Sequence, residues 1–118
     1  MGPILDIADP EIEVHAVTLG IEGRHYQGHD GVRQWMRDIR DRFGARTHAD
    51  AVVPLGDDAV IVRGTLFISD GYGGEDEEQR YAMVVHLRDG KARWIGTFFS
   101  AADAKAAYDA GLTGPRPG

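Results

Sequence analysis

Apolar and polar residues alternate along residues 80–88 and again along residues 91–99, and Asp89-Gly90 joins the two stretches. Alternation with a period of two is typical of a strand with one buried face. An Asp-Gly pair between two such runs is a strong signal of a tight hairpin turn. A two-residue turn there sets Arg88 opposite Lys91, and the pairing then runs inward until Tyr81 lies opposite Phe98. We therefore predict a hairpin of two long strands.

This register sorts the hairpin side chains onto two faces, because neighbouring residues of a strand point to opposite sides of a sheet. The face predicted to be covered is apolar or aromatic throughout and carries Tyr81, Met83, Val85, Leu87, Ala92, Trp94, Gly96 and Phe98. The opposite, mixed face carries Arg80, Ala82, Val84, His86, Arg88, Lys91, Arg93, Ile95, Thr97 and Phe99. The first face should form part of the core.

The rest of the chain is predicted to supply three more strands, one long helix and a short terminal helix. Strands are expected at residues 12–19, 47–55 and 59–69, with a bulge or bend at Gly64. Residues 101–110 form an alanine-rich helix, and residues 113–118 are expected to be a disordered tail. The long helix, residues 29–43, follows from apolar residues at helical spacing, which are Val32, Trp35, Met36, Ile39 and Phe43.

The opposite face of that helix, which includes Asp38, is predicted to be solvated charge. One helix of this length cannot cover both faces of a five-stranded sheet. We therefore predict one domain, residues 1–112, of the α+β class, in which a curved, mostly antiparallel sheet wraps around the helix. A chain of 118 residues suits a single domain with a core of its own.

The composition argues against several classes of partner. The chain has no cysteine, so it has neither disulfides nor a thiolate metal site, and a cytoplasmic location is the simplest expectation. The net charge of −6 argues against a nucleic-acid partner. No apolar run is long enough for a membrane helix and no signal peptide is evident, so we expect no membrane partner.

Four short motifs resemble those of SnoaL-like proteins of the NTF2-like superfamily, and they occur in the family's order. They are Asp9-Pro10-Glu11-Ile12-Glu13-Val14, the segment YQGHDGVRQW at residues 26–35, Leu87-Arg88-Asp89-Gly90-Lys91 and Ala110-Gly111-Leu112. The resemblance implies an α+β cone with an apolar pocket inside, and pairing of subunits through the sheet. It also implies a long helix before the first strand, for which residues 1–11 leave room only in shortened form.

The predicted pocket is lined by aromatic and soft side chains, with the hydroxyl groups of two tyrosines available to orient a ligand. These residues are Tyr26, Trp35, Tyr81, Met83, Trp94 and Phe98. A packed core without a cavity is equally compatible with this set.

Catalysis in relatives of this kind uses polar residues of the last strand, often a tyrosine followed by a carboxylate. The matching stretch here is Phe98-Phe99-Ser100. Without an inner carboxylate the usual proton-transfer base is missing, so we favour binding of a small hydrophobic molecule over catalysis. Two alternatives stay open. One is an isomerase-, cyclase- or hydratase-type enzyme acting on a polyketide- or steroid-like substrate, and the other is an assembly module with a filled core.

Five histidines raise the question of a metal site. His25 and His29 are four residues apart, but both precede the expected helix and do not share a helical face. His15 and His86 fall on the outer phase of their strands. We therefore expect no metal and no other cofactor.

The outer face of the hairpin has an apolar centre and a polar rim, which is the usual pattern of a protein interface. An antiparallel sheet packed on its own copy supplies the self-complementary surface that a twofold contact needs. We therefore expect a homodimer, formed through Val84, His86, Arg93, Ile95, Thr97 and Phe99.

Overall fold

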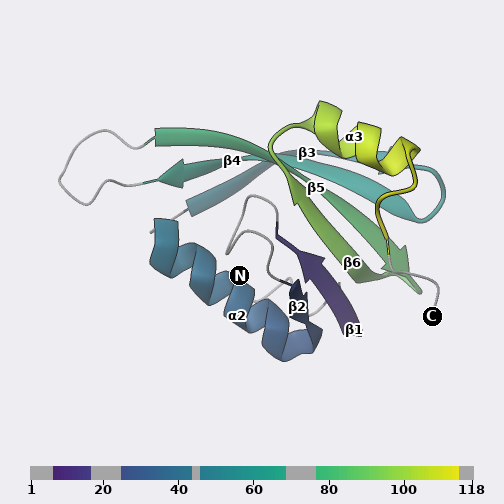
Figure 1. The fold of residues 1–118 in the computed structure, drawn as a ribbon, viewed down its shortest axis with the longest axis horizontal. Coiled ribbons are helices and arrows are strands. Elements are labelled where there is room, and N and C mark those ends of the chain that lie inside the picture. The colour runs from purple at the N-terminus through teal and green to yellow at the C-terminus, as the bar shows by residue number, and fades with distance from the viewer. Residues whose placement is uncertain (1–6, 17–24, 44–45, 69–76, 115–118) are drawn as a thin grey trace.

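A curved six-stranded sheet lies between two helices in the computed structural model, which describes residues 7–16, 25–43, 46–68 and 77–114 (Figure 1). The strands are β1 (Ala8–His15), β2 (His25–Gln27), β3 (Arg46–Leu55), β4 (Ala59–Ile68), β5 (Glu77–Arg88) and β6 (Lys91–Phe98). The helices are α2 (Gly28–Phe43) and α3 (Ala101–Asp109).

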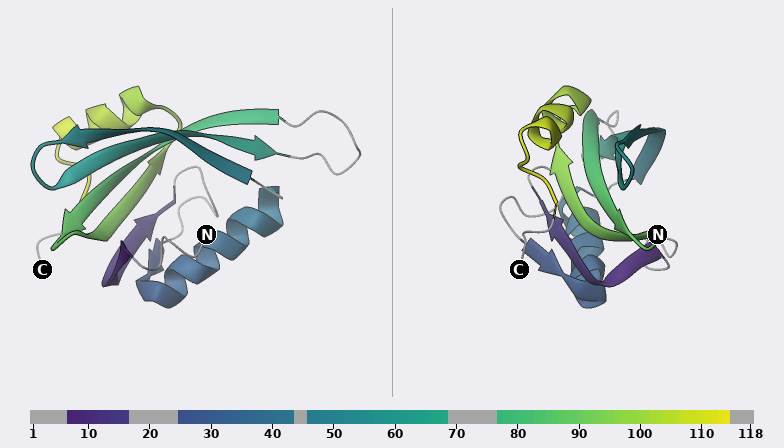
Figure 2. Two further views of the ribbon diagram at one scale, coloured as in Figure 1. Left: turned by 180° about the vertical axis from the view of Figure 1, so that it is seen from behind. Right: turned by 90° about the vertical axis from the view of Figure 1, so that its right-hand side faces the viewer.

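The order of strands across the sheet is β2-β1-β6-β5-β4-β3. β1 and β6 are parallel, and the other four neighbouring pairs are antiparallel. The sheet bends around α2, which packs mainly on β1 and β2, while α3 lies on the other side against β4, β5 and β6 (Figure 2). We call the side that carries α2 the concave face and the side that carries α3 the convex face. The α+β cone expected from the sequence is confirmed.

Each face of the sheet has its own core. The concave core is centred on Ile12, Val14, Val32, Trp35, Ile39, Tyr81, Val85 and Ile95. The convex core, under α3, is formed by Leu55, Ala59, Ile61, Ala82, Val84, Trp94 and Ala104. Burial of both faces explains why the middle of β5, residues 81–85 (YAMVV), contains no charged residue.

The long helix forms where the apolar spacing predicted it. Val32, Trp35 and Ile39 are buried against the sheet, and Asp30 lies in the first turn, where a negative charge favours the helix dipole. The helix begins one residue earlier than predicted, at Gly28, whose positive φ of 71° suits glycine.

The hairpin turn is confirmed, but the predicted register is wrong beyond the first pairs. Arg88 pairs with Lys91 and Leu87 with Ala92, as expected, but His86 then pairs with Trp94 and Val85 with Ile95. The one-residue shift is a β-bulge that leaves Arg93 without an opposite residue. Because a shift of one residue exchanges the faces, Trp94 and Phe98 lie on the convex face.

A close contact within β6 fits this arrangement. Trp94 is buried, and its indole lies so close to Gly96 that a Cβ added there would clash with the ring. Glycine at this position therefore lets the indole lie along the strand beneath α3. The bulge and Gly96 together give the largest side chain of β6 a place in the convex core.

Other differences from the prediction are smaller. The first strand is Ala8–His15 and not residues 12–19, and the short strand β2 was not predicted. A register shift in β3, between Ala49 and Ala51, occurs opposite Gly64, where a bulge or bend was predicted. Most of the expected tail, and residues 1–6 of the N-terminal segment expected to hold a shortened helix, lie outside the described residues, while residues 8–11 belong to β1.

Candidate functional site

The six side chains predicted to line one pocket are divided between the two faces of the sheet. Tyr26, Trp35, Tyr81 and Met83 belong to the concave core or pack against it. Trp94 and Phe98 belong to the convex core under α3. The prediction of a single pocket lined by all six residues is therefore wrong, because the bulge at Arg93 places Trp94 and Phe98 on the opposite face of the sheet from the one predicted.

The concave face carries apolar side chains that the core only partly covers. Val52, at the edge strand β3, is 62% exposed, and it pairs with Val62. Because α2 packs mainly on β1 and β2, the part of the concave face formed by β3, β4 and β5 extends beyond it. We call this area the concave apolar surface. It consists of Val52, Val60, Val62, Met83 and Leu87 on these strands, and it also includes Met36 of α2.

A tyrosine and a carboxylate meet beside this core. The Tyr26 hydroxyl donates a hydrogen bond to the Asp38 carboxylate at 2.6 Å, and the Gln34 side-chain amide donates to the same group at 2.7 Å. The Tyr26 ring lies 6.5 Å from the Trp35 ring, centroid to centroid. Asp38 is partly buried, so its assignment to a fully solvated helix face was wrong. The pattern of α2 alone held no signal for it, since its partner comes from β2.

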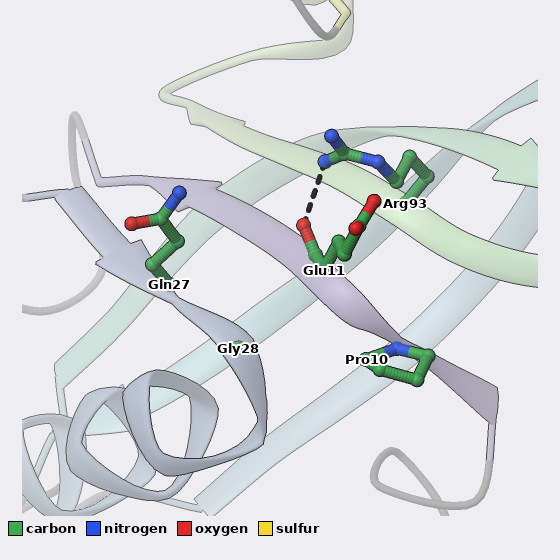
Figure 3. A pocket seen from close by; sticks show the side chains of 5 residues that line it. All are labelled: Pro10, Glu11, Gln27, Gly28 and Arg93. Atoms are coloured by element: carbon green, nitrogen blue, oxygen red, sulfur yellow. Dashed lines mark hydrogen bonds between the residues drawn. The ribbon is translucent and has the colours of Figure 1, made fainter.

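A polar cleft of about 480 Å³ opens where β2 ends and α2 begins (Figure 3). Arg93 reaches from β6 over β1, and its Nη1 donates a hydrogen bond to the backbone oxygen of Glu11 at 2.7 Å. The Glu13 carboxylate lies 4.0 Å from the same guanidinium. The residues that line the cleft are Pro10, Glu11, Gln27, Gly28 and Arg93.

Beside the cleft, an ion pair ties β1 to the end of the hairpin. Asp9 is buried, and it accepts hydrogen bonds from the Glu11 backbone N–H at 2.8 Å and from Arg88 Nη2 at 2.9 Å. The Glu11 backbone N–H first, and then the Arg88 guanidinium, hold the pKa of the Asp9 carboxyl below its ordinary value, although burial acts in the opposite direction. These contacts are structural, since the Asp9 carboxylate and the Arg88 guanidinium already bind each other.

A row of aromatic rings crosses the convex face next to the cleft. His15 and His25 lie directly opposite each other on β1 and β2, with ring centroids 4.1 Å apart. His15 is 5.2 Å from Trp94, and Trp94 is 5.5 Å from His86. Burial lowers the pKa of His86, while Asp58 partly opposes this.

The sequence interpretation missed the histidine pair because β2 was not expected. A smaller cavity of about 130 Å³ adjoins the pair and is lined by Glu13, His15, His25, Tyr26 and Gln27. Within residues 7–16, 25–43, 46–68 and 77–114, no group of three or more histidine and acidic residues is placed to hold a metal ion.

The residues predicted to form a dimer interface are mostly occupied within the chain. Val84, Ile95 and Thr97 are buried, and the last two point into the concave side. His86 is hydrogen-bonded to Thr113 at 2.8 Å. Phe99 is 54% exposed. The interface drawn from the sequence is therefore wrong as a set of residues, while the homodimer itself stays a prediction.

Solved structures with this architecture are numerous, and three illustrate it. TerC, crystallised with polyporic acid, has a TM-score of 0.68 at 21% identity over 92% of this chain and 85% of that chain. An NTF2-like protein of unknown function from Burkholderia pseudomallei has a TM-score of 0.68 at 18% identity, over 89% of this chain and 82% of that chain. A hypothetical protein from Catenulispora acidiphila with a ketosteroid isomerase-like fold, in complex with trimethylamine, gives 0.65 at 10% identity over 86% and 76%.

These similarities define the fold of the chain, which is an NTF2-like α+β cone. Sequence comparisons go no further, since no protein-family model and no curated protein matches the chain. Among the described residues, no helix combines the length and the apolar character needed to cross a membrane.

Proposed function

We propose that the protein binds a small, mainly apolar molecule at the concave apolar surface. The observation that carries this proposal is the run of partly covered side chains on β3, β4 and β5, with Val52 62% exposed at its rim. Contact with a ligand removes such surface from water, which stabilises the complex by about 25 cal/mol for each Å² of apolar area buried. Concave, mostly apolar surfaces with few polar groups are the usual sites for small molecules.

Two further features support this proposal. The surface contains two methionines, Met36 and Met83, whose flexible thioether side chains adapt to ligands of different shape. Two proteins of similar structure are known with a small molecule, namely polyporic acid for TerC and trimethylamine for the Catenulispora acidiphila protein. We infer a neutral or weakly polar ligand, since the six side chains that define the surface are all apolar.

Neighbouring valines of β3 give a matched test. Val52 pairs with Val62 on the concave face, and Val53, which is 43% exposed, pairs with Ile61 on the convex face. We expect Val52→Asp to weaken binding of the neutral dye Nile red by about tenfold, because a carboxylate in the contact must be desolvated. Val53→Asp should leave the affinity unchanged. Fluorescence titration measures both.

Comparing the same substitution on the two faces distinguishes a binding site on the concave face from a general effect of added negative charge on dye binding. Equal losses in the two variants, or a wild type that does not bind the dye, would contradict the proposal. Thermal unfolding of each variant serves as the control for folding, since both valines are exposed enough to tolerate the change.

A second candidate is an enzyme of the isomerase, cyclase or hydratase kind, and the Tyr26–Asp38 hydrogen bond of 2.6 Å favours it. A partly buried carboxylate that a tyrosine holds in place can act as a proton acceptor. This candidate predicts turnover of a steroid- or polyketide-like substrate that Asp38→Asn abolishes while dye binding is kept. Turnover that survives in Asp38→Asn would exclude this carboxylate as the base.

A further inference from the structure

His15 and His25 form a cross-strand pair on the convex face. They are direct partners in the antiparallel β1–β2 ladder, and their side chains project to the same side. The two imidazole rings approach to 4.1 Å between centroids, with planes 55° apart. The pair therefore brings two nitrogen ligands of the same type together on adjacent strands.

The surroundings leave this pair open to solvent on one side. His25 is exposed, and the His15 side chain is 32% exposed. Both line the cavity of about 130 Å³, together with Glu13 and Gln27. Trp94, 5.2 Å from His15, packs against the other side of the pair and limits how far the His15 ring can move.

A third potential ligand lies close to the pair. The Glu13 carboxylate Oε2 is 3.8 Å from His15 Nε2. Arg93 lies 4.0 Å from the same carboxylate oxygen and competes for it. The imidazoles are therefore the principal donors, and Glu13 can assist only by leaving Arg93.

We propose that His15 and His25 together bind one divalent transition-metal ion, with water in the remaining positions. Neutral imidazole suits Cu²⁺, Ni²⁺ and Zn²⁺, whereas Ca²⁺ and Mg²⁺ require oxygen ligands. Two protein ligands leave coordination positions open, so the site is an exchangeable one and differs from a closed structural zinc site. The affinity should follow the usual order for such ions, with Cu²⁺ bound more tightly than Zn²⁺.

The proposed metal site is independent of ligand binding on the concave apolar surface. β1 and β2 place the histidine side chains on the convex face, whereas the concave apolar surface lies on the opposite face of the sheet. Loss of one activity should therefore leave the other intact.

Single histidine substitutions test the pair against ordinary surface binding. Isothermal titration of the tag-free protein with CuCl₂ should show one site, and His25→Ala and His15→Ala should each weaken it by at least about tenfold, since each removes half of the chelate. The matched control is His48→Ala on β3. His48 has a nearby carboxylate, with its Nε2 3.6 Å from Asp50, but lies on an edge strand away from the pair. This control should bind like the wild type.

Electron paramagnetic resonance of the Cu²⁺ complex gives a second readout, which should show two equivalent nitrogen ligands in the wild type and one in His25→Ala. Equal weakening in His48→Ala, or an unchanged affinity in both pair variants, would mean that the metal binds elsewhere on the surface. Unfolding curves without metal check the fold, and His25→Ala is the safer variant because its side chain is exposed.

Discussion

Replacing Trp94 by alanine is expected to lower the free energy of unfolding by about 3–5 kcal/mol. The indole is only 5% exposed and belongs to the convex core, where it packs with Val84 and Ala104 beneath α3. Alanine leaves a cavity that the two-layer packing cannot close, and the helix loses the largest side chain beneath it. Denaturant unfolding followed by circular dichroism measures the change.

The position of the damage distinguishes the observed register from the one expected from the sequence. If Trp94 lies on the convex face, amide hydrogen exchange in Trp94→Ala should speed up mainly in α3 and not in α2. Trp35→Ala, a loss of the same side chain from the concave core, should have the opposite pattern. Faster exchange in α2 on loss of Trp94 would show that the indole faces the concave core.

Replacing Gly64 by alanine is expected to cost about 3 kcal/mol. A Cβ at this position would overlap the backbone oxygen of His48 and both the hydroxyl and the ring carbon Cζ of Tyr81. The backbone oxygen belongs to the partner strand β3 and can move only if the ladder beside the bulge between Ala49 and Ala51 opens. The midpoint of thermal unfolding of the purified variant measures the loss.

A second substitution separates the two contacts at Gly64. Tyr81→Leu removes both the hydroxyl and the ring, so Gly64→Ala should cost less stability in the Tyr81→Leu background than in the wild type, and the loss that remains is the part caused by the His48 oxygen. A Gly64→Ala variant as stable as the wild type would mean that β3 and β4 are not packed as closely as the structure has them.

Local patterns predicted the elements that depend on them. The spacing of Val32, Trp35 and Ile39 specified α2 because one turn of a helix returns each apolar side chain to the same face. Asp89 and Gly90, both with positive φ, specified the hairpin turn. In each case the information lies within a few residues of the element itself.

The face of the sheet to which each side chain of β6 points could not be predicted from a local pattern. A bulge adds one residue, and nothing in the alternation of apolar and polar residues marks Arg93 as the extra one. The contacts that select it are distant, since its guanidinium bonds the backbone of Glu11 on β1. Because of this one extra residue, Trp94 lies in the convex core and Ile95 in the concave core, which is the reverse of the predicted faces.

The polar features of the candidate sites were missed for a related reason. β2 has three residues, too few for any period to appear in the sequence. Its pairing with β1 nevertheless places Tyr26 near Asp38 and His25 opposite His15. The apolar members of the concave surface were partly predicted, because Met83 and Leu87 lie on the face of β5 that was predicted to be covered.

Ligand binding on the concave apolar surface can be measured most directly by nuclear magnetic resonance of methyl-labelled methionine. The chain has three methionines, and Met36 on α2 and Met83 on β5 both belong to this surface. Titration with Nile red, and then with steroid-like compounds, should shift the methyl signals of Met36 and Met83 in proportion to occupancy. Binding that leaves the signals of Met36 and Met83 unmoved would contradict the proposed site.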